Sequence, residues 1–130
     1  MCVRMGSANV GTMTGRHGEV VEMVSRRRLN FCCLQETNWK GHGARMFDKY
    51  KFFWQGCEEG MAEAGVSFLV EESWIEEILE VKRVSERIMV LRVRVGKSVL
   101  NLVSAYAPQR GKKMTEKEEF LISLGEFYRL

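Results

Sequence analysis

A short apolar run followed at once by a carboxylate constrains this chain more than any other feature. Phe31–Leu34 is uninterrupted apolar sequence, and Gln35, Glu36 and Thr37 come directly after it. A run this short and dense is typical of a strand buried on both faces of a sheet. A carboxylate in that position costs free energy unless it is exposed, hydrogen-bonded or metal-bound. The pattern therefore predicts a buried strand that carries Glu36 to the edge of a sheet.

Apolar patterning divides the rest of the chain into short elements. Alternation of apolar and polar residues predicts strands, and apolar residues three or four positions apart predict helices. We expect strands at Arg4–Val10, Tyr50–Gln55, Gly65–Val70, Ile78–Val84, Arg87–Val95 and Ser98–Ala105. We expect helices over Gly15–Arg28 and after the capping box Thr115–Glu118.

Two connecting segments carry glycines. Residues 38–49, which include Gly41 and Gly43, are predicted to be less regular. Gly96-Lys97 suits a two-residue turn with glycine at its first central position. The element order is β, α, β, then mostly β, then α. This order predicts the α/β (α+β) class, with a mainly antiparallel sheet and flanking helices.

Composition narrows the class of protein. The 130 residues suit one domain, and 45% of them are hydrophobic while 28% are charged, so a packed core is expected. No apolar run approaches the roughly 20 residues of a membrane helix, and the first residues lack a signal-peptide core. We therefore expect an intracellular protein without membrane association. The net charge of +3 permits a polyanionic partner without arguing for one.

The cysteines give little support to a metal or redox protein. The four are Cys2, Cys32, Cys33 and Cys57, and none falls in a C-x₂-C pattern. A zinc site is therefore disfavoured. Cys32 and Cys33 are expected on opposite faces of a strand as small apolar residues.

Polar residues at three predicted strand ends are the candidate site. Asn9, Glu36 and Tyr106 supply an amide, a carboxylate and a phenol, which would converge if their strands are neighbours. Hard oxygen ligands of this kind suit Mg²⁺ and a phosphodiester. From spacing alone the alternative stays open: Glu36 starts a solvated loop, Asn9 begins a turn, and Tyr106 is an amphipathic rim residue.

Three segments in this order resemble the first three motifs of the endonuclease/exonuclease/phosphatase superfamily. They are Gly6–Val10, Cys33–Trp39 and Leu102–Pro108. The wider sequence, including Met13–Val21 and Tyr50–Gly56, most resembles the endonuclease domain of RTE/BovB-type non-LTR retrotransposons. It resembles equally the craniofacial-development-protein-like open reading frames derived from them.

The resemblance implies a fold and a set of roles. The fold would be a partial four-layer sandwich of the deoxyribonuclease I-like type, with residues 1–130 as a single incomplete domain. Glu36 would ligand Mg²⁺ (or Mn²⁺), and Asn9 would orient the metal-site carboxylates and the scissile phosphate. Tyr106 would donate a hydrogen bond to a phosphate oxygen. Further phosphate contacts with DNA, the implied partner in the nucleus, would come from Lys40, Arg110 and Lys112.

The sequence also departs from the superfamily pattern. The later Gly-Asp-Phe-Asn-like and Ser-Asp-His-like motifs are absent, Ala8 replaces a tryptophan, and Asn38 replaces a basic residue. We therefore expect a Mg²⁺-dependent phosphodiesterase or DNA endonuclease that is truncated and inactive alone. One sheet face would be uncovered and open to self-association. The alternative is a non-catalytic, retrotransposon-derived remnant with at most weak nucleic-acid or protein binding.

Overall fold

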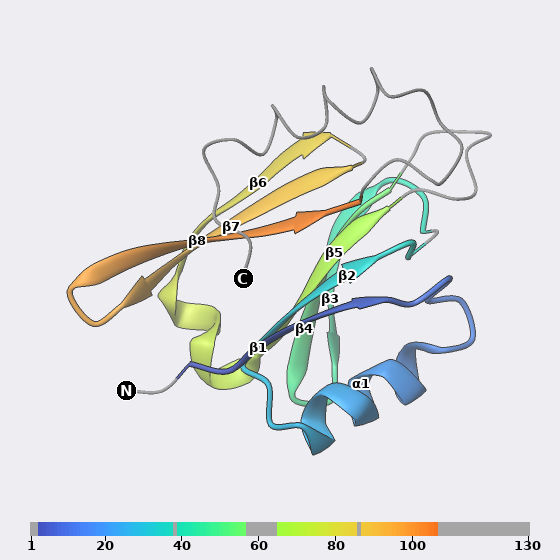
Figure 1. Ribbon diagram of the computed structural model, residues 1–130, viewed down its shortest axis with the longest axis horizontal. Helices are drawn as coiled ribbons and strands as arrows, with labels where there is room; N and C mark the ends of the chain where they lie inside the picture. The colour runs from blue at the N-terminus through green and yellow to red at the C-terminus, as the bar shows by residue number, and fades with distance from the viewer. Residues whose placement is uncertain (1–2, 38, 57–64, 86, 107–130) are drawn as a thin grey trace.

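In the described part of the chain, two β-sheets and one α-helix are stacked in layers (Figure 1). The computed structural model describes residues 3–37, 39–56, 65–85 and 87–106. The first elements are β1 (Met5–Asn9), α1 (His17–Arg26), β2 (Phe31–Gln35), β3 (His42–Phe47) and β4 (Tyr50–Gln55). They are followed by β5 (Val66–Glu71), the 3₁₀ helix η1 (Glu72–Glu77), β6 (Ile78–Ser85), β7 (Ile88–Val95) and β8 (Ser98–Ala105).

The larger sheet has the strand order β1-β2-β5-β4-β3. β1 and β2 are parallel, because α1 crosses between them, and the other neighbours are antiparallel. Its pairing is continuous at one end, where a single residue of each strand lies in register. These residues, which we call the end row, are Asn9, Gln35, Val66, Gln55 and His42.

The smaller sheet, β6-β7-β8, is antiparallel and packs on one face of the larger sheet. Phe31, Phe68 and Val70 of the larger sheet meet Leu91 and Leu102 of the smaller one in an inter-sheet core. Each of these side chains is fully buried, so this layer supplies much of the hydrophobic stabilisation.

The opposite face of the larger sheet is covered by α1, as Figure 1 shows. Val20 and Val24 of the helix pack with Cys32, Leu34 and Leu69 in a helix-side core. β2 is therefore buried on both faces, as its apolar run predicts. The predicted α+β class, with mainly antiparallel sheets and a flanking helix, is confirmed.

The prediction that residues 38–49 are irregular is wrong for residues 42–47, which form β3. β3 pairs with β4 along its whole length, from His42 opposite Gln55 to Phe47 opposite Tyr50. Gly43 lies in this strand and faces the Trp54 ring. A Cβ atom at position 43 would lie 2.8 Å from that ring, so only glycine leaves enough room. The glycine signals a close contact across the strand pair and not a loop.

The helix is shorter than the predicted Gly15–Arg28. It ends at Arg26, and Arg28 has a left-handed φ of 54° that turns the chain away. The amide of Leu29 then donates to the carbonyl of Val24, at 3.1 Å, which closes the helix end. The 3₁₀ helix η1 was not predicted.

Other sequence predictions are confirmed or lie outside the described residues. The turn at Gly96 joins β7 to β8 with a φ of 61°. The expected helix after Thr115–Glu118 lies outside the described part of the chain, and self-association through an uncovered face stays a prediction. Among the residues described, none of the helices has the length and apolar character that crossing a membrane requires.

Gly56, directly after β4, packs against residues 39–41, the segment that precedes β3. Its amide donates to the carbonyl of Gly41 at 2.6 Å, and a Cβ atom would overlap the carbonyl oxygen of Trp39. We expect Gly56→Ala to lower the free energy of unfolding by at least about 2 kcal/mol, because backbone must move to admit the methyl group. Chemical unfolding measures this change.

The matched control is Gly18→Ala in α1, where a Cβ atom meets nothing within 4 Å. Alanine is the better helix former, so this substitution should raise stability by up to about 1 kcal/mol. Equal stability of the Gly56→Ala protein and the parent would contradict the close packing of Gly56 against Trp39.

Candidate functional site

The end row brings two predicted site residues together. Asn9 ends β1 directly opposite Gln35, which ends β2, and Glu36 is the next residue. This neighbourhood follows from the parallel pairing of β1 with β2, because parallel strands end at the same edge of a sheet. Spacing along the chain could not show this, since Asn9 and Glu36 are far apart in sequence.

Glu36 has a left-handed backbone conformation that residues other than glycine rarely adopt. Its φ is 57°, and its amide donates to the carbonyl of Gly65 at 2.9 Å. Strained backbone of this kind costs about 1–3 kcal/mol and concentrates at functional sites. The residue is half-buried, whereas the following Thr37 is fully buried and so is closed to a solvent-borne ligand.

Asn9 is exposed and has a defined amide orientation. Its side-chain oxygen accepts a hydrogen bond from the amide of Gly11 at 3.2 Å. This local contact uses the oxygen, so the amide nitrogen is the part of Asn9 that can donate to a bound anion.

A polar network behind these residues was missed by sequence reasoning. The Gln35 amide nitrogen lies 3.2 Å from the Ser7 hydroxyl and 3.4 Å from the Ser104 hydroxyl. Ser104 in turn donates to the carbonyl of Leu34 at 3.0 Å. The network joins β1, β2 and β8, and it connects the two sheets at the site. The available signal was Ser104, a polar residue at an inward position of an apolar strand.

Tyr106 reaches the same end of the sandwich but packs inward. Its amide donates to the carbonyl of Arg87 at 2.9 Å, and the residue, 6% exposed, belongs to the inter-sheet core. Lys40 is exposed in the loop after β2, where its carbonyl accepts from the Trp54 indole at 3.2 Å. The predicted contacts Arg110 and Lys112 lie outside the described residues.

The oxygen donors near Glu36 fit Mg²⁺ only together with water and substrate phosphate. Within residues 3–37, 39–56, 65–85 and 87–106, no three His, Cys, Asp or Glu side chains lie close enough to hold a metal ion together. Mg²⁺ commonly binds through one or two carboxylates plus water and substrate phosphate. Glu36 can supply one such carboxylate next to the end row, where Asn9 and Gln35 each add one amide oxygen.

A cation lies farther along the same end of the molecule. Arg83 of β6 donates from Nη2 to the carbonyl of Gly43 at 3.0 Å and from Nε to the carbonyl of Trp54 at 3.3 Å. Burial lowers the pKa of Arg83, yet a guanidinium stays charged at neutral pH. Arg83 therefore links the smaller sheet to β3 and β4.

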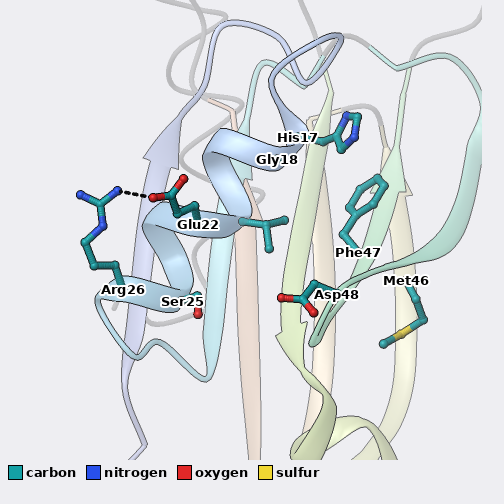
Figure 2. Close-up of a pocket in the computed structure, with 9 residues that line it drawn as sticks. His17, Gly18, Glu22, Ser25, Arg26, Met46, Phe47 and Asp48 are labelled. Atoms are coloured by element: carbon teal, nitrogen blue, oxygen red, sulfur yellow. Dashed lines mark hydrogen bonds and ion pairs between the residues drawn. The ribbon is translucent and has the colours of Figure 1, made fainter.

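A groove on the helix layer is separate from this site. Figure 2 shows that it lies between α1 and the β3–β4 turn. Its volume is about 620 Å³. His17 stacks on Phe47 at 4.9 Å between ring centroids, and Glu22 pairs with Arg26 at 3.2 Å. Met46 to Asp48 line it at the end of β3 opposite His42, so the groove takes no part in the end row.

The cysteine pair is inert in the folded protein. Cys32 packs in the helix-side core and Cys33 in the inter-sheet core, which confirms that they face opposite sides of β2. Burial raises the pKa of Cys32 to about 12, and burial together with the neighbouring Cys32 raises that of Cys33 to about 12. A thiol with so high a pKa is neither a ready nucleophile nor a ready zinc ligand.

The chain is similar to solved structures of three endonucleases. The AP endonuclease LMAP from Leishmania major is 13% identical with a TM-score of 0.66, over 94% of this chain and 45% of that one. The endonuclease domain of TRAS1, a telomere-specific non-LTR retrotransposon, is 19% identical with a TM-score of 0.65, over 94% and 53%. An AP endonuclease from Archaeoglobus fulgidus is 18% identical with a TM-score of 0.64, over 95% and 49%.

These likenesses show the fold. The chain has the deoxyribonuclease I-like architecture of these endonucleases, and it spans about half the length of the structures it matches. No protein-family model matches the sequence, and no curated protein does so.

The buried thiols predict a loss of stability at alkaline pH. Both have a raised pKa when folded, about 12 against 9.0 for the free group, so the unfolded chain releases their protons first. Their contribution is fully present below about pH 9 and is lost as pH rises towards 12. Unfolding free energies measured between pH 8 and 10.5 should therefore fall with pH.

The control is a Cys32→Ala, Cys33→Ala protein, in which the fall over this pH range should be shallower. Both proteins would carry Cys2→Ser and Cys57→Ser, so that labelling by a thiol reagent reports the buried pair alone. Rapid labelling of the native parent at pH 8, without denaturant, would contradict the burial of these thiols.

Proposed function

We propose that the end-row site binds the phosphodiester backbone of a nucleic acid together with Mg²⁺, as part of a DNA endonuclease or related phosphodiesterase. The observation that carries this proposal is the pairing of β1 with β2, which places Asn9 beside a Glu36 held in a strained, left-handed conformation. The fold shared with two AP endonucleases and a retrotransposon endonuclease domain supports the choice of substrate class.

Each residue has a proposed role that follows from its chemistry. The Glu36 carboxylate would hold Mg²⁺, and the amide nitrogen of Asn9 would donate to a phosphate oxygen. When bound, the metal would neutralise negative charge on the phosphate oxygens and the leaving group. Tyr106 would donate its hydroxyl to the phosphate from the edge of the inter-sheet core, and exposed Lys40 would add a salt-dependent contact.

The described residues do not supply a general base at this site. His42 is in the end row, but four strand spacings of ~4.8 Å separate it from Asn9, about 19 Å in all. Asp48 follows β3 at the opposite end of the sheet. Loss of a general base costs about 10²–10⁴ in rate, and we propose that catalysis needs acidic and histidine groups beyond these.

The non-catalytic alternative has one observation in its favour. The described residues contain no cluster of three metal-binding side chains, so a bound nucleic acid could be held without being cut. Where this alternative takes the form of nucleic-acid binding and not protein binding, both proposals require the end row to meet a phosphate backbone. They differ in whether Glu36 binds a divalent cation there.

Paramagnetic Mn²⁺ tests the metal role of Glu36 without relying on activity. In the presence of a short DNA oligonucleotide, substoichiometric Mn²⁺ should broaden the NMR amide signals of Asn9, Gln35 and Gly65. Glu36→Gln removes the carboxylate charge and should weaken this effect at least about tenfold, since loss of even a supporting group near a metal costs 10–100-fold in affinity. Titration of signal intensity gives the ratio.

The matched control is Glu72→Gln, which removes an exposed carboxylate from η1 at the opposite end of the larger sheet. Its end-row broadening should equal that of the parent. Broadening that persists unchanged in Glu36→Gln would count against Glu36 as a ligand and would favour the non-catalytic alternative.

We expect no measurable nuclease activity from the 130-residue chain alone. Incubation with supercoiled plasmid in Mg²⁺ should give no more nicked product than a Glu36→Ala preparation, because the described site has neither a base nor a second carboxylate. Gel electrophoresis measures the nicked fraction. Nicking by the parent that disappears in Glu36→Ala would overturn this expectation.

A further inference from the structure

We propose that Arg83 is a second phosphate-binding residue, which positions a nucleic-acid backbone several nucleotides away from Asn9. This inference rests on the proposed function and adds a residue to it. Neither the sequence motifs nor the strand-end argument points to position 83, which lies within the smaller sheet.

The side chain of Arg83 is fixed by backbone carbonyls. Its Nη2 and Nε atoms donate to Gly43 and Trp54, in β3 and β4, at 3.0 and 3.3 Å. Both acceptors are neutral, and within the described part of the chain no carboxylate lies within ion-pair distance of Arg83. The guanidinium is therefore held in place by neutral acceptors, and among the described residues it has no carboxylate partner.

A guanidinium has five N–H donors, and these two carbonyl contacts use two of them. Arg83 is half-buried and not fully enclosed. Its planar fork matches phosphate geometry, and a preorganised guanidinium loses less entropy per hydrogen bond than a free one. The remaining donors thus suit an anion that approaches from the end of the sandwich.

The location of Arg83 sets the spacing between the two contacts. Gly43 and Trp54 face each other one position from the end row, in the strands three and four steps from β1. At ~4.8 Å per step, Arg83 lies about 14–19 Å from Asn9 along the sheet end. A duplex advances ~3.4 Å per nucleotide on one strand, so this separation corresponds to about four to six nucleotides.

An exposed lysine near Arg83 also favours an anionic ligand. His42 belongs to the same end row. Exposed Lys40 precedes β3 by two positions, and its backbone carbonyl accepts a hydrogen bond from the Trp54 indole. These groups and Arg83 extend the site from Asn9 across the sheet end. A polyanion that is bound at Glu36 and Asn9 would run over them.

The test is the salt dependence of DNA binding, measured by fluorescence anisotropy with a 24-base-pair duplex. Losing one phosphate contact should reduce the slope of log affinity against log salt by about 0.9. We expect this reduction in Arg83→Gln and a largely retained slope in Arg83→Lys, which keeps the charge. Arg94→Gln, an exposed residue on the outer face of β7, controls for net charge and should leave the slope unchanged.

A second measurement does not depend on how well the variants fold. In the parent protein, the side-chain Nε–H signal of Arg83, assigned through bonds from its own backbone, should shift on addition of the duplex, and that of Arg94 should not. An unshifted Arg83 signal, or an unchanged salt slope in a folded Arg83→Gln protein, would overturn the inference while leaving the proposed function intact. Absence of any DNA binding by the parent would overturn both.

Discussion

The continuous register of the larger sheet is the constraint on which the rest of the structure depends. One residue of each of five strands lies in the end row, so chain segments far apart in sequence meet at one edge. A slip of one residue between β1 and β2 would move Asn9 away from Gln35 and would turn the apolar residues of a strand to the opposite face. The two cores therefore enforce the register, and the register in turn positions the candidate site.

The interior of the sandwich changes character at this end. Fully buried apolar side chains such as Phe68 and Leu91 fill the space between the sheets. Nearer the end row, Gln35 and Ser104 form one polar link between the sheets, and Arg83 forms another. Burying such groups is costly unless they are hydrogen-bonded, and each has partners here. The polar links fix the relative position of the sheets where the site needs it.

The sequence predicts those elements whose conformation depends on neighbouring residues in the chain. The run Phe31–Leu34 identifies its strand because it is buried on both faces, and the carboxylate after it marks the strand end. The helix end at Arg26 and the strand β3 were misjudged, because a left-handed Arg28 and a Trp54 ring over Gly43 depend on tertiary packing. The Ser104 link and the Arg83 contacts join residues of different sheets, so no sequence window contains them. Resemblance, and not spacing, made Glu36 a candidate metal ligand.

The polar groups at this end of the larger sheet are too far apart for all of them to share one role. A group acts on a reacting phosphate only within hydrogen-bond reach, either directly or through one water. Asn9 is paired with Gln35, the residue before Glu36, one strand spacing away, so the proposed function assigns Asn9 and Glu36 a shared ligand. Arg83 and His42 lie about three to four strand spacings away, so they can only hold other parts of a long polyanion. Under the proposed function, an extended substrate would contact both Asn9 and Arg83, whereas a small phosphate ester would contact only one of them.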